Sequence, residues 1–251
     1  MRNIYFVGTA GSGKSSLVLS YKEWLDVNGI DSIIVNLDPG ADALPYETDI
    51  DIREWICLQD VMDEYALGPN GAQVVCADLM AMNTDKLTDA LGKYKTNYVL
   101  IDTPGQLELF VFRGSSNIIA EALGKERSMT VFLADPMLCR TSNGFISSIM
   151  LSSIVQFRLR MPMINILSKS DTLAEDEMNR VMSWFSDPDS LYGDMLDNCG
   201  DPQTVIGMEL FKAMENIGVF GDIKAVSSKE SLGMEELYAA SQQCFFGGED
   251  A

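Results

Sequence analysis

Short, nearly uninterrupted runs of apolar residues recur along the chain, and most are followed directly by a glycine or an aspartate. Runs without polar alternation are typical of strands buried on both faces, as in the parallel sheets of α/β proteins. The runs predict strands at 3–7, 32–37, 98–101, 129–134, 162–167 and 222–226. We therefore expect a mostly parallel central sheet.

Between these strands, apolar residues return every three or four positions, which is the spacing of a helix with one buried face. The spacing predicts helices over 16–28, 51–67 and 142–160, a helical region at about 83–95, and a last helix through Met234, Leu237 and Tyr238. Helices that alternate with strands cover both faces of a sheet, so a three-layer α/β fold is expected. No linker or internal repeat divides the sequence, and a single domain over residues 1–251 is the simplest interpretation.

Residues 174–217 are longer than a connection between two neighbouring strands requires. This stretch is acidic and rich in methionine, and proline-containing turns interrupt it. We interpret it as a helical insertion at the edge of the sheet, available for dimer or partner contacts. A plain helical cover of the sheet is an equally good interpretation.

The charge balance narrows the range of partners. The chain carries 37 acidic and 18 basic residues, a formal net charge of −19. Such a surface repels nucleic acids and anionic membranes, so neither is an expected partner. No segment reaches the roughly 18 apolar residues of a membrane span. The first strand begins at residue 3, which leaves no room for a signal peptide.

The cysteine and histidine content limits which metal sites and catalytic nucleophiles the chain can form. The five cysteines form no C-x-x-C pair, as expected of reduced thiols, and a cytoplasmic location is predicted. The chain has no histidine, which excludes histidine-ligated metals and nucleophiles activated by histidine.

The loop after the first strand carries the strongest chemical signal. Residues 8–15 read GTAGSGKS and fit the P-loop pattern G-x-x-x-x-G-K-[ST], with a strand before and a helix after. Backbone N–H groups of such a loop close around the β-phosphate of a nucleotide, and the helix N-terminus attracts its negative charge. Lys14 is expected at the β- and γ-phosphates, and the Ser15 hydroxyl on Mg²⁺. The predicted phosphate-binding residues are Gly11, Ser12, Gly13, Lys14, Ser15 and Ser16.

Two further strands end in aspartates. Asp102 follows four apolar residues, as a Mg²⁺-holding Walker B aspartate does, and begins the D-x-x-G-Q sequence of residues 102–106. The Gly105 amide would meet the γ-phosphate, and Gln106 with Glu108 would help to orient water. Asp38 ends the second strand and is a candidate either for Mg²⁺ or for the attacking water, although Asp-Pro-Gly is also a favourable turn.

The fifth and sixth strands lead into segments suited to a guanine base. Ser168–Asp171 reads SKSD, in which Asp171 can accept both the N1–H and the N2 amine of guanine while the Lys169 stem covers the base. The common form is [NT]-K-x-D; Ser168 keeps a hydroxyl and lacks the amide. Backbone and hydroxyl groups of Ser227, Ser228 and Lys229 could bind guanine O6.

Residues 67–71 read LGPNG, and on composition they are a helix stop followed by a turn. The combination of Gly68-Pro69-Asn70 with the motifs NLDP at 36–39 and DTPGQLELF at 102–110, however, resembles the GPN-loop GTPases. The resemblance covers essentially the whole chain. Gly40 stands where that family more often has alanine.

This resemblance implies a three-layer P-loop NTPase fold of the dimerising class that includes the signal-recognition and MinD groups. It also implies GTP and GDP as ligands, Mg²⁺ as cofactor, and a homodimer in which Gly68, Pro69 and Asn70 reach the partner's nucleotide. Asn70 would approach the γ-phosphate there, and Asp38 would polarise the attacking water with support from Gln106 and Glu108. Eukaryotic relatives assist RNA polymerase assembly, whereas this short chain resembles the archaeal form, whose client protein is not clear.

Three other functions compete with this reading. A metal-delivering GTPase would present cysteine and histidine, and neither is arranged for it here. A MinD-type ATPase would carry an additional lysine early in the P-loop, where this chain has Thr9 and Ala10. A scaffold that holds nucleotide without turnover is disfavoured by the intact Lys14, Ser15 and Asp102 but remains open.

Overall fold

The computed structural model describes residues 1–196, 202–216 and 223–247. Within them, seven parallel strands form one sheet in the order β3–β2–β4–β1–β5–β6–β7. They are β1 Arg2–Gly8, β2 Ser32–Asn36, β3 Ile50–Asp51, β4 Tyr98–Asp102, β5 Ser128–Ala134, β6 Met163–Leu167 and β7 Ile223–Ala225. The predicted parallel α/β sheet is confirmed, with β3 as an additional short strand; the expected start of the last strand, Asp222, lies outside the described residues.

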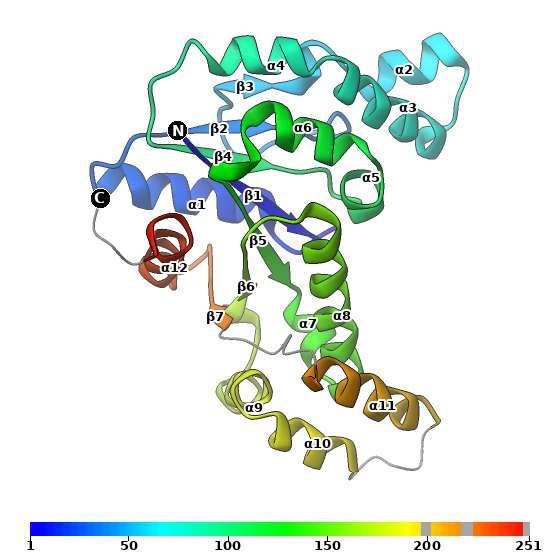
Figure 1. The fold of residues 1–251 in the computed structure, drawn as a ribbon, viewed down its shortest axis with the longest axis vertical. Helices are drawn as coiled ribbons and strands as arrows, with labels where there is room; N and C mark the ends of the chain where they lie inside the picture. Colours follow the sequence, from blue (N-terminus) through cyan, green and yellow to red (C-terminus); the bar gives the residue numbers. More distant parts are fainter. Residues whose placement is uncertain (197–201, 217–222, 248–251) are drawn as a thin grey trace.

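Helices cover both faces of this sheet (Figure 1). They are α1 Lys14–Val27, α2 Leu58–Tyr65, α3 Pro69–Met82, α4 Thr84–Leu91, α5 Leu107–Val111, α6 Ser115–Leu123, α7 Pro136–Cys139, α8 Ser142–Leu159, α9 Glu175–Ser186, α10 Pro188–Leu196, α11 Pro202–Asn216 and α12 Met234–Phe246. Short 3-10 turns occur at Ile52–Glu54, Lys125–Arg127 and Ser170–Thr172.

The core is divided by the sheet into two apolar clusters. Along β1, Ile4 and Phe6 belong to the cluster under α1 and α12, whereas Tyr5 and Val7 belong to the larger cluster on the other face. Successive side chains of a strand point to opposite faces, so a strand that is apolar at every position must be buried on both. This is why uninterrupted runs located the strands correctly.

The region between β2 and β4 differs from the expectation. A helix was predicted over 51–67, but β3 and a 3-10 turn precede α2, which begins only at Leu58. The predicted stop is real, since Ala66 adopts the left-handed conformation that ends α2. Gly68 and Pro69, however, begin the helix α3 rather than a turn. Proline suits the first helical position because its missing N–H would have had no partner there.

The last part of the chain follows the sequence more closely. Helix α8 is confirmed, but Phe157, one of the apolar residues whose helical spacing predicted a buried face over 142–160, is 74% exposed. The stretch 174–217 contains α9, α10 and α11, which extend beyond the end of the sheet near α8 (Figure 1). In the ranges that the structure describes, no helix is both long and apolar enough to span a membrane.

Candidate functional site

The P-loop connects the end of β1 to the start of α1. Gly11 and Gly13 have φ angles of +75° and +95°, a region that side chains with a Cβ rarely adopt, so glycine is required at both positions. No side chain caps the N-terminus of α1 at Gly13, which leaves its first N–H groups open to an anion.

Lys14 is buried at this loop and folds back onto it. Its Nζ donates to the carbonyl oxygens of Gly8 (2.9 Å) and Thr9 (3.0 Å). Burial lowers the pKa of Lys14, and the charges of Asp102 and Asp38 oppose that shift. Both aspartates are therefore close enough to affect the charge on Lys14, as expected if one ligand is to contact Lys14, Asp38 and Asp102 together.

Asp102 ends β4 and is only 2% exposed. Its Oδ2 accepts a hydrogen bond from the Tyr46 hydroxyl at 2.6 Å, and its Oδ1 is buried without a hydrogen-bond partner among the described residues. Burial raises the pKa of Asp102, while the nearby Ser15 hydroxyl and the hydrogen bond from Tyr46 oppose the increase. An unpartnered buried carboxylate oxygen beside a serine hydroxyl is a fitting donor set for Mg²⁺, which prefers oxygen ligands.

No cluster of three or more acidic, cysteine or histidine side chains that could hold a metal occurs within the residues described. A site for Mg²⁺ does not require such a cluster, because that ion usually takes one or two protein carboxylates and completes its shell with water and substrate phosphates.

Asp38 lies beyond β2 and joins two loops. Its Oδ1 accepts the backbone N–H of Gly40 at 2.9 Å, and its Oδ2 accepts the N–H of Gly105 at 3.1 Å. The Gly105 N–H, predicted to bind the γ-phosphate, is therefore in direct contact with the Asp38 carboxylate, which is a candidate to polarise the attacking water. The contact joins residues 67 positions apart in the chain.

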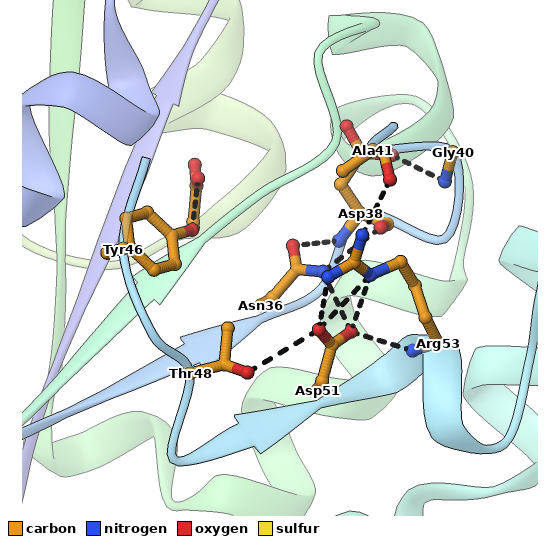
Figure 2. Close-up of polar contacts among 9 residues, drawn as sticks. Asn36, Asp38, Gly40, Ala41, Tyr46, Thr48, Asp51 and Arg53 are labelled. Carbon is orange, nitrogen blue, oxygen red and sulfur yellow. Dashed lines mark hydrogen bonds and ion pairs between the residues drawn. The ribbon is translucent and has the colours of Figure 1, made fainter. Parts of the chain in front are cut away.

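A side-chain network supports the loop that carries Asp38 (Figure 2). Asn36 accepts the Asp38 N–H (2.9 Å) and donates to Asp51 (3.0 Å), while Arg53 binds both oxygens of Asp51 and the Ala41 carbonyl oxygen (2.8 Å). Burial opposes ionisation of Asp51, but its hydrogen bonds with Arg53 and Asn36 hold its pKa below the usual value. Sequence reasoning missed Asp51 and Arg53 as site residues; the signal available was their opposite charges two positions apart, on either side of the apolar residue Ile52.

A cavity of about 350 Å³ adjoins the P-loop at the predicted base-binding segments. Its lining includes Gly13, Ser16, Leu17, Ser20, Pro45, Ser168, Lys169, Asp171, Thr172, Val226, Ser228 and Lys229. The Lys169 Nζ donates to the Gly11 carbonyl oxygen, and the Ser227 hydroxyl donates to Asp171 at 2.6 Å. Ser168, the departure from the common motif, donates to the Ala134 carbonyl oxygen at 3.0 Å. It therefore ties the base motif to the end of β5.

Three predicted catalytic residues do not reach this cavity within one chain. Gln106 and Glu108 are exposed at the start of α5, and Asn70 is exposed in the first turn of α3. Gly68 and Pro69 are exposed beside Asn70. The α3 helix nevertheless adjoins the Asp38 loop, since a Cβ built on Gly40 would lie 3.8 Å from Gln73 Nε2.

Comparisons with known proteins identify relatives of this chain. A family described as "Conserved hypothetical ATP binding protein" matches residues 6–246. The GPN-loop GTPase QQT1 of Arabidopsis thaliana is 39% identical over 171 residues, which are 66% of this chain and 57% of that protein. The chain thus spans little more than half the length of that relative.

Two comparisons involve relatives that the chain covers more completely. GPN-loop GTPase 3 of Saccharomyces cerevisiae is 34% identical over 75% of this chain and 70% of its own length. GPN-loop GTPase PAB0955 of Pyrococcus abyssi is 38% identical over 75% of each chain. Its crystal structure, described as a GTPase in apo form, superposes with a TM-score of 0.87 and 30% identity over 98% of both chains.

Proposed function

The chain belongs to the GPN-loop GTPase family, and we propose that it binds GTP with Mg²⁺, hydrolyses it and works as a homodimeric switch. The observation that carries the proposal is the single cavity that joins the P-loop to Asp171. It brings together residues from the P-loop and α1, from the segment after β6 and from the segment after β7, as a ligand with both phosphates and a base requires.

The base-binding side favours guanine. Asp171 offers carboxylate oxygens to the two donors on one edge of guanine, and adenine has no such pair of donors. The matching family is described as ATP binding, whereas the relatives from Arabidopsis thaliana and Pyrococcus abyssi are named GPN-loop GTPases. We propose guanine because Asp171 lines the cavity together with the Lys169 stem. Ser227 orients the carboxylate, and Ser228 with Lys229 lies on the O6 side.

The phosphate-binding side uses the P-loop. Gly11, Ser12 and Gly13 would present their backbone N–H groups to the β-phosphate, and Ser16 would bind the α-phosphate at the start of α1. Lys14 would exchange its two carbonyl partners for the β- and γ-phosphates. Ser15 and Asp102 would hold Mg²⁺, which would neutralise the negative charge that develops on the phosphates.

The hydrolytic side centres on Asp38. Its carboxylate accepts the Gly105 N–H, the group proposed to bind the γ-phosphate, so it lies beside the position where water must attack. A γ-phosphate that takes this N–H would release one carboxylate oxygen for the water proton. We assign Asp38 to the water rather than to Mg²⁺, because Asp102 is the aspartate with an unpartnered buried oxygen.

The remaining proposed catalytic residues require a second subunit. Gly68, Pro69 and Asn70 are exposed at the free N-terminus of α3, which favours a role on the partner's nucleotide. Gln106 and Glu108, exposed at the start of α5, would join the water network once the site is closed. The family resemblance further favours a cytoplasmic role in assembling a protein complex related to RNA polymerase.

The proposal is tested by three measurements on the intact protein. Binding of GTP, GDP and ATP is compared by calorimetry with and without Mg²⁺, phosphate release is followed, and mass is determined by light scattering in each nucleotide state. We expect GTP and GDP to bind, ATP to be rejected, and GTP to favour the dimer. Tight GTP binding without phosphate release would indicate a nucleotide-gated scaffold instead.

A further inference from the structure

Tyr46 contacts Asp102 from the loop after β2, although the two residues are 56 positions apart. The Tyr46 hydroxyl donates to Oδ2 of Asp102 at 2.6 Å and so satisfies one of the two carboxylate oxygens. The other oxygen, Oδ1, is buried without a hydrogen-bond partner in the described part of the chain. Leaving a buried carboxylate oxygen without a donor is unfavourable, and a cation on Oδ1 would remove the penalty.

The loop that carries Tyr46, residues 38–49, is fixed at several points, and we refer to it as the arch. Near its start Arg53 donates to the Ala41 carbonyl oxygen at 2.8 Å. At its end Asp49 accepts the Ile34 N–H through Oδ2 (2.9 Å) and donates its own N–H to the Ile34 carbonyl oxygen (3.0 Å). The arch is therefore held to β2 and to the turn after β3 without any contribution from a ligand.

The ring of Tyr46 is held by packing as well as by the arch. Its ring packs against the apolar cluster under α1 and α12, and its neighbour Pro45 lines the base cavity. The ring is thus placed by packing and by the fixed arch, and the hydroxyl is delivered to Asp102 as a consequence (Figure 2 shows Tyr46 on the arch).

We propose that Tyr46 is a positioning residue of the magnesium site, whose hydroxyl holds Oδ2 of Asp102 so that Oδ1 is the oxygen left for the metal. This inference rests on the proposed function, because it presumes that Mg²⁺ accompanies the nucleotide. The alternative is that Tyr46 competes with the metal ion for Asp102. A competing side chain would have to move away when the metal binds, and it would be expected to cover both carboxylate oxygens. The arch is fixed and the Tyr46 hydroxyl binds only Oδ2, which favours a positioning role.

The test is Tyr46→Phe, which keeps the ring and removes only the donor. The quantities measured are the Mg²⁺ concentration that half-saturates binding of a fluorescent GDP analogue, and Mn²⁺ binding in the presence of GDP by electron paramagnetic resonance. Outer-shell partners of metal ligands typically change metal affinity by 10-fold to 100-fold. We expect roughly a tenfold higher Mg²⁺ requirement, a similar loss of Mn²⁺ affinity, and unchanged nucleotide binding in excess chelator.

Tyr94→Phe is the matched control. The Tyr94 hydroxyl donates to the Asp49 carbonyl oxygen at 2.9 Å, so this variant removes a tyrosine hydrogen bond from the same arch without touching Asp102. It should retain the parent's Mg²⁺ requirement. Incorporation of 3-fluorotyrosine at position 46 restores a donor and should restore that requirement as well.

The outcomes separate this inference from the proposed function. If the parent binds GDP with a clear Mg²⁺ dependence and Tyr46→Phe has the same or a lower requirement, Tyr46 is not a support, and the function stands. A higher requirement in both Tyr46→Phe and Tyr94→Phe would also overturn the inference, since the effect would then belong to the arch in general. A parent protein that binds no guanine nucleotide would overturn both.

Discussion

The two halves of the nucleotide site are built differently. The half that faces the base and the β-phosphate consists of loops at the ends of β1, β6 and β7, where Lys14, Ser168 and Lys169 each donate to a backbone carbonyl oxygen. The half that faces the γ-phosphate depends on the arch, where Asn36, Asp51 and Arg53 fix the position of Asp38 through side chains. Its proposed last member, Asn70, is exposed.

This difference separates affinity from turnover. A half whose side chains are already bonded to the backbone is largely complete before the ligand arrives, so it should account for most of the ground-state binding energy. The half that faces the γ-phosphate needs an ordered arch and, in our proposal, a second subunit. Its catalytic groups therefore come together only when the right ligand is bound. Substitutions in the two halves should therefore have different kinetic signatures.

The largest expected effect is on turnover, from Asp38→Asn. The change removes the carboxylate that we assign to the attacking water and leaves the P-loop intact. We expect kcat to fall roughly 10²-fold or more while KM for GTP changes little, because the group acts in the transition state. Asp42→Asn, an exposed aspartate of the same arch, is the control. Unchanged kcat with a collapsed GTP affinity would reassign Asp38 to Mg²⁺ binding or folding.

On the base side, Asp171→Asn should act mainly on affinity. It replaces an acceptor by a donor that faces the guanine amine, and the loss of a charged bidentate contact is worth about 2–3 kcal/mol, or roughly 30-fold to 150-fold in Kd. Calorimetry with GTP and ATP measures it. Asp176→Asn, in the exposed first turn of α9, is the control. Parental GTP affinity in Asp171→Asn together with continued rejection of ATP would refute the base assignment.

The proposed contribution of the second subunit is tested by complementation. Asn70→Ala and Lys14→Ala should each be defective, but a mixed dimer contains one site with an intact Lys14 and an intact incoming Asn70. With random subunit exchange in an equal mixture, activity should rise to about a quarter of wild-type sites, as two-fold symmetry requires. The measurement is phosphate release before and after mixing, with exchange followed by fluorescence transfer. Proven exchange without recovery would mean that Asn70 acts within its own chain.

The smallest effect is expected from Arg53→Gln, which weakens support for the arch. Breaking a partly buried, hydrogen-bonded ion pair should lower the free energy of unfolding by about 2 kcal/mol at pH 7. The lowered pKa of Asp51 means that the pair stabilises the fold above the unfolded pKa of about 3.9, and that this contribution is lost as pH falls through the folded value. Urea unfolding at pH 7 and pH 3 should therefore show that the stability difference between the parent and Arg53→Gln shrinks in acid.

Arg113→Gln is the control, because it removes an exposed ion pair with Asp78. It should change the free energy of unfolding by less than about 1 kcal/mol.

The main error of sequence interpretation concerned the segment between β2 and β4. Composition indicated a helix over 51–67 and a turn at Gly68 and Pro69, whereas the chain forms β3, a 3-10 turn, α2 and then α3. Glycine followed by proline ends one helix as readily as it begins the next, and the local pattern does not distinguish the two. The exposure of Phe157 is a similar case, since helical spacing of apolar residues does not show whether another element covers them.

The sequence by itself determined the parallel sheet, the P-loop and the aspartates that follow β2, β4 and β6. These features depend on short-range regularities: a run apolar at every position must be buried on both faces, and a glycine loop between strand and helix has few other uses. Only the tertiary structure decided that the Tyr46 hydroxyl donates to Asp102, that Asp38 accepts the Gly105 N–H, and that Arg53 binds the arch at Ala41. The first two contacts join residues 56 and 67 positions apart, and their partners are brought together by strand order, which no local pattern encodes.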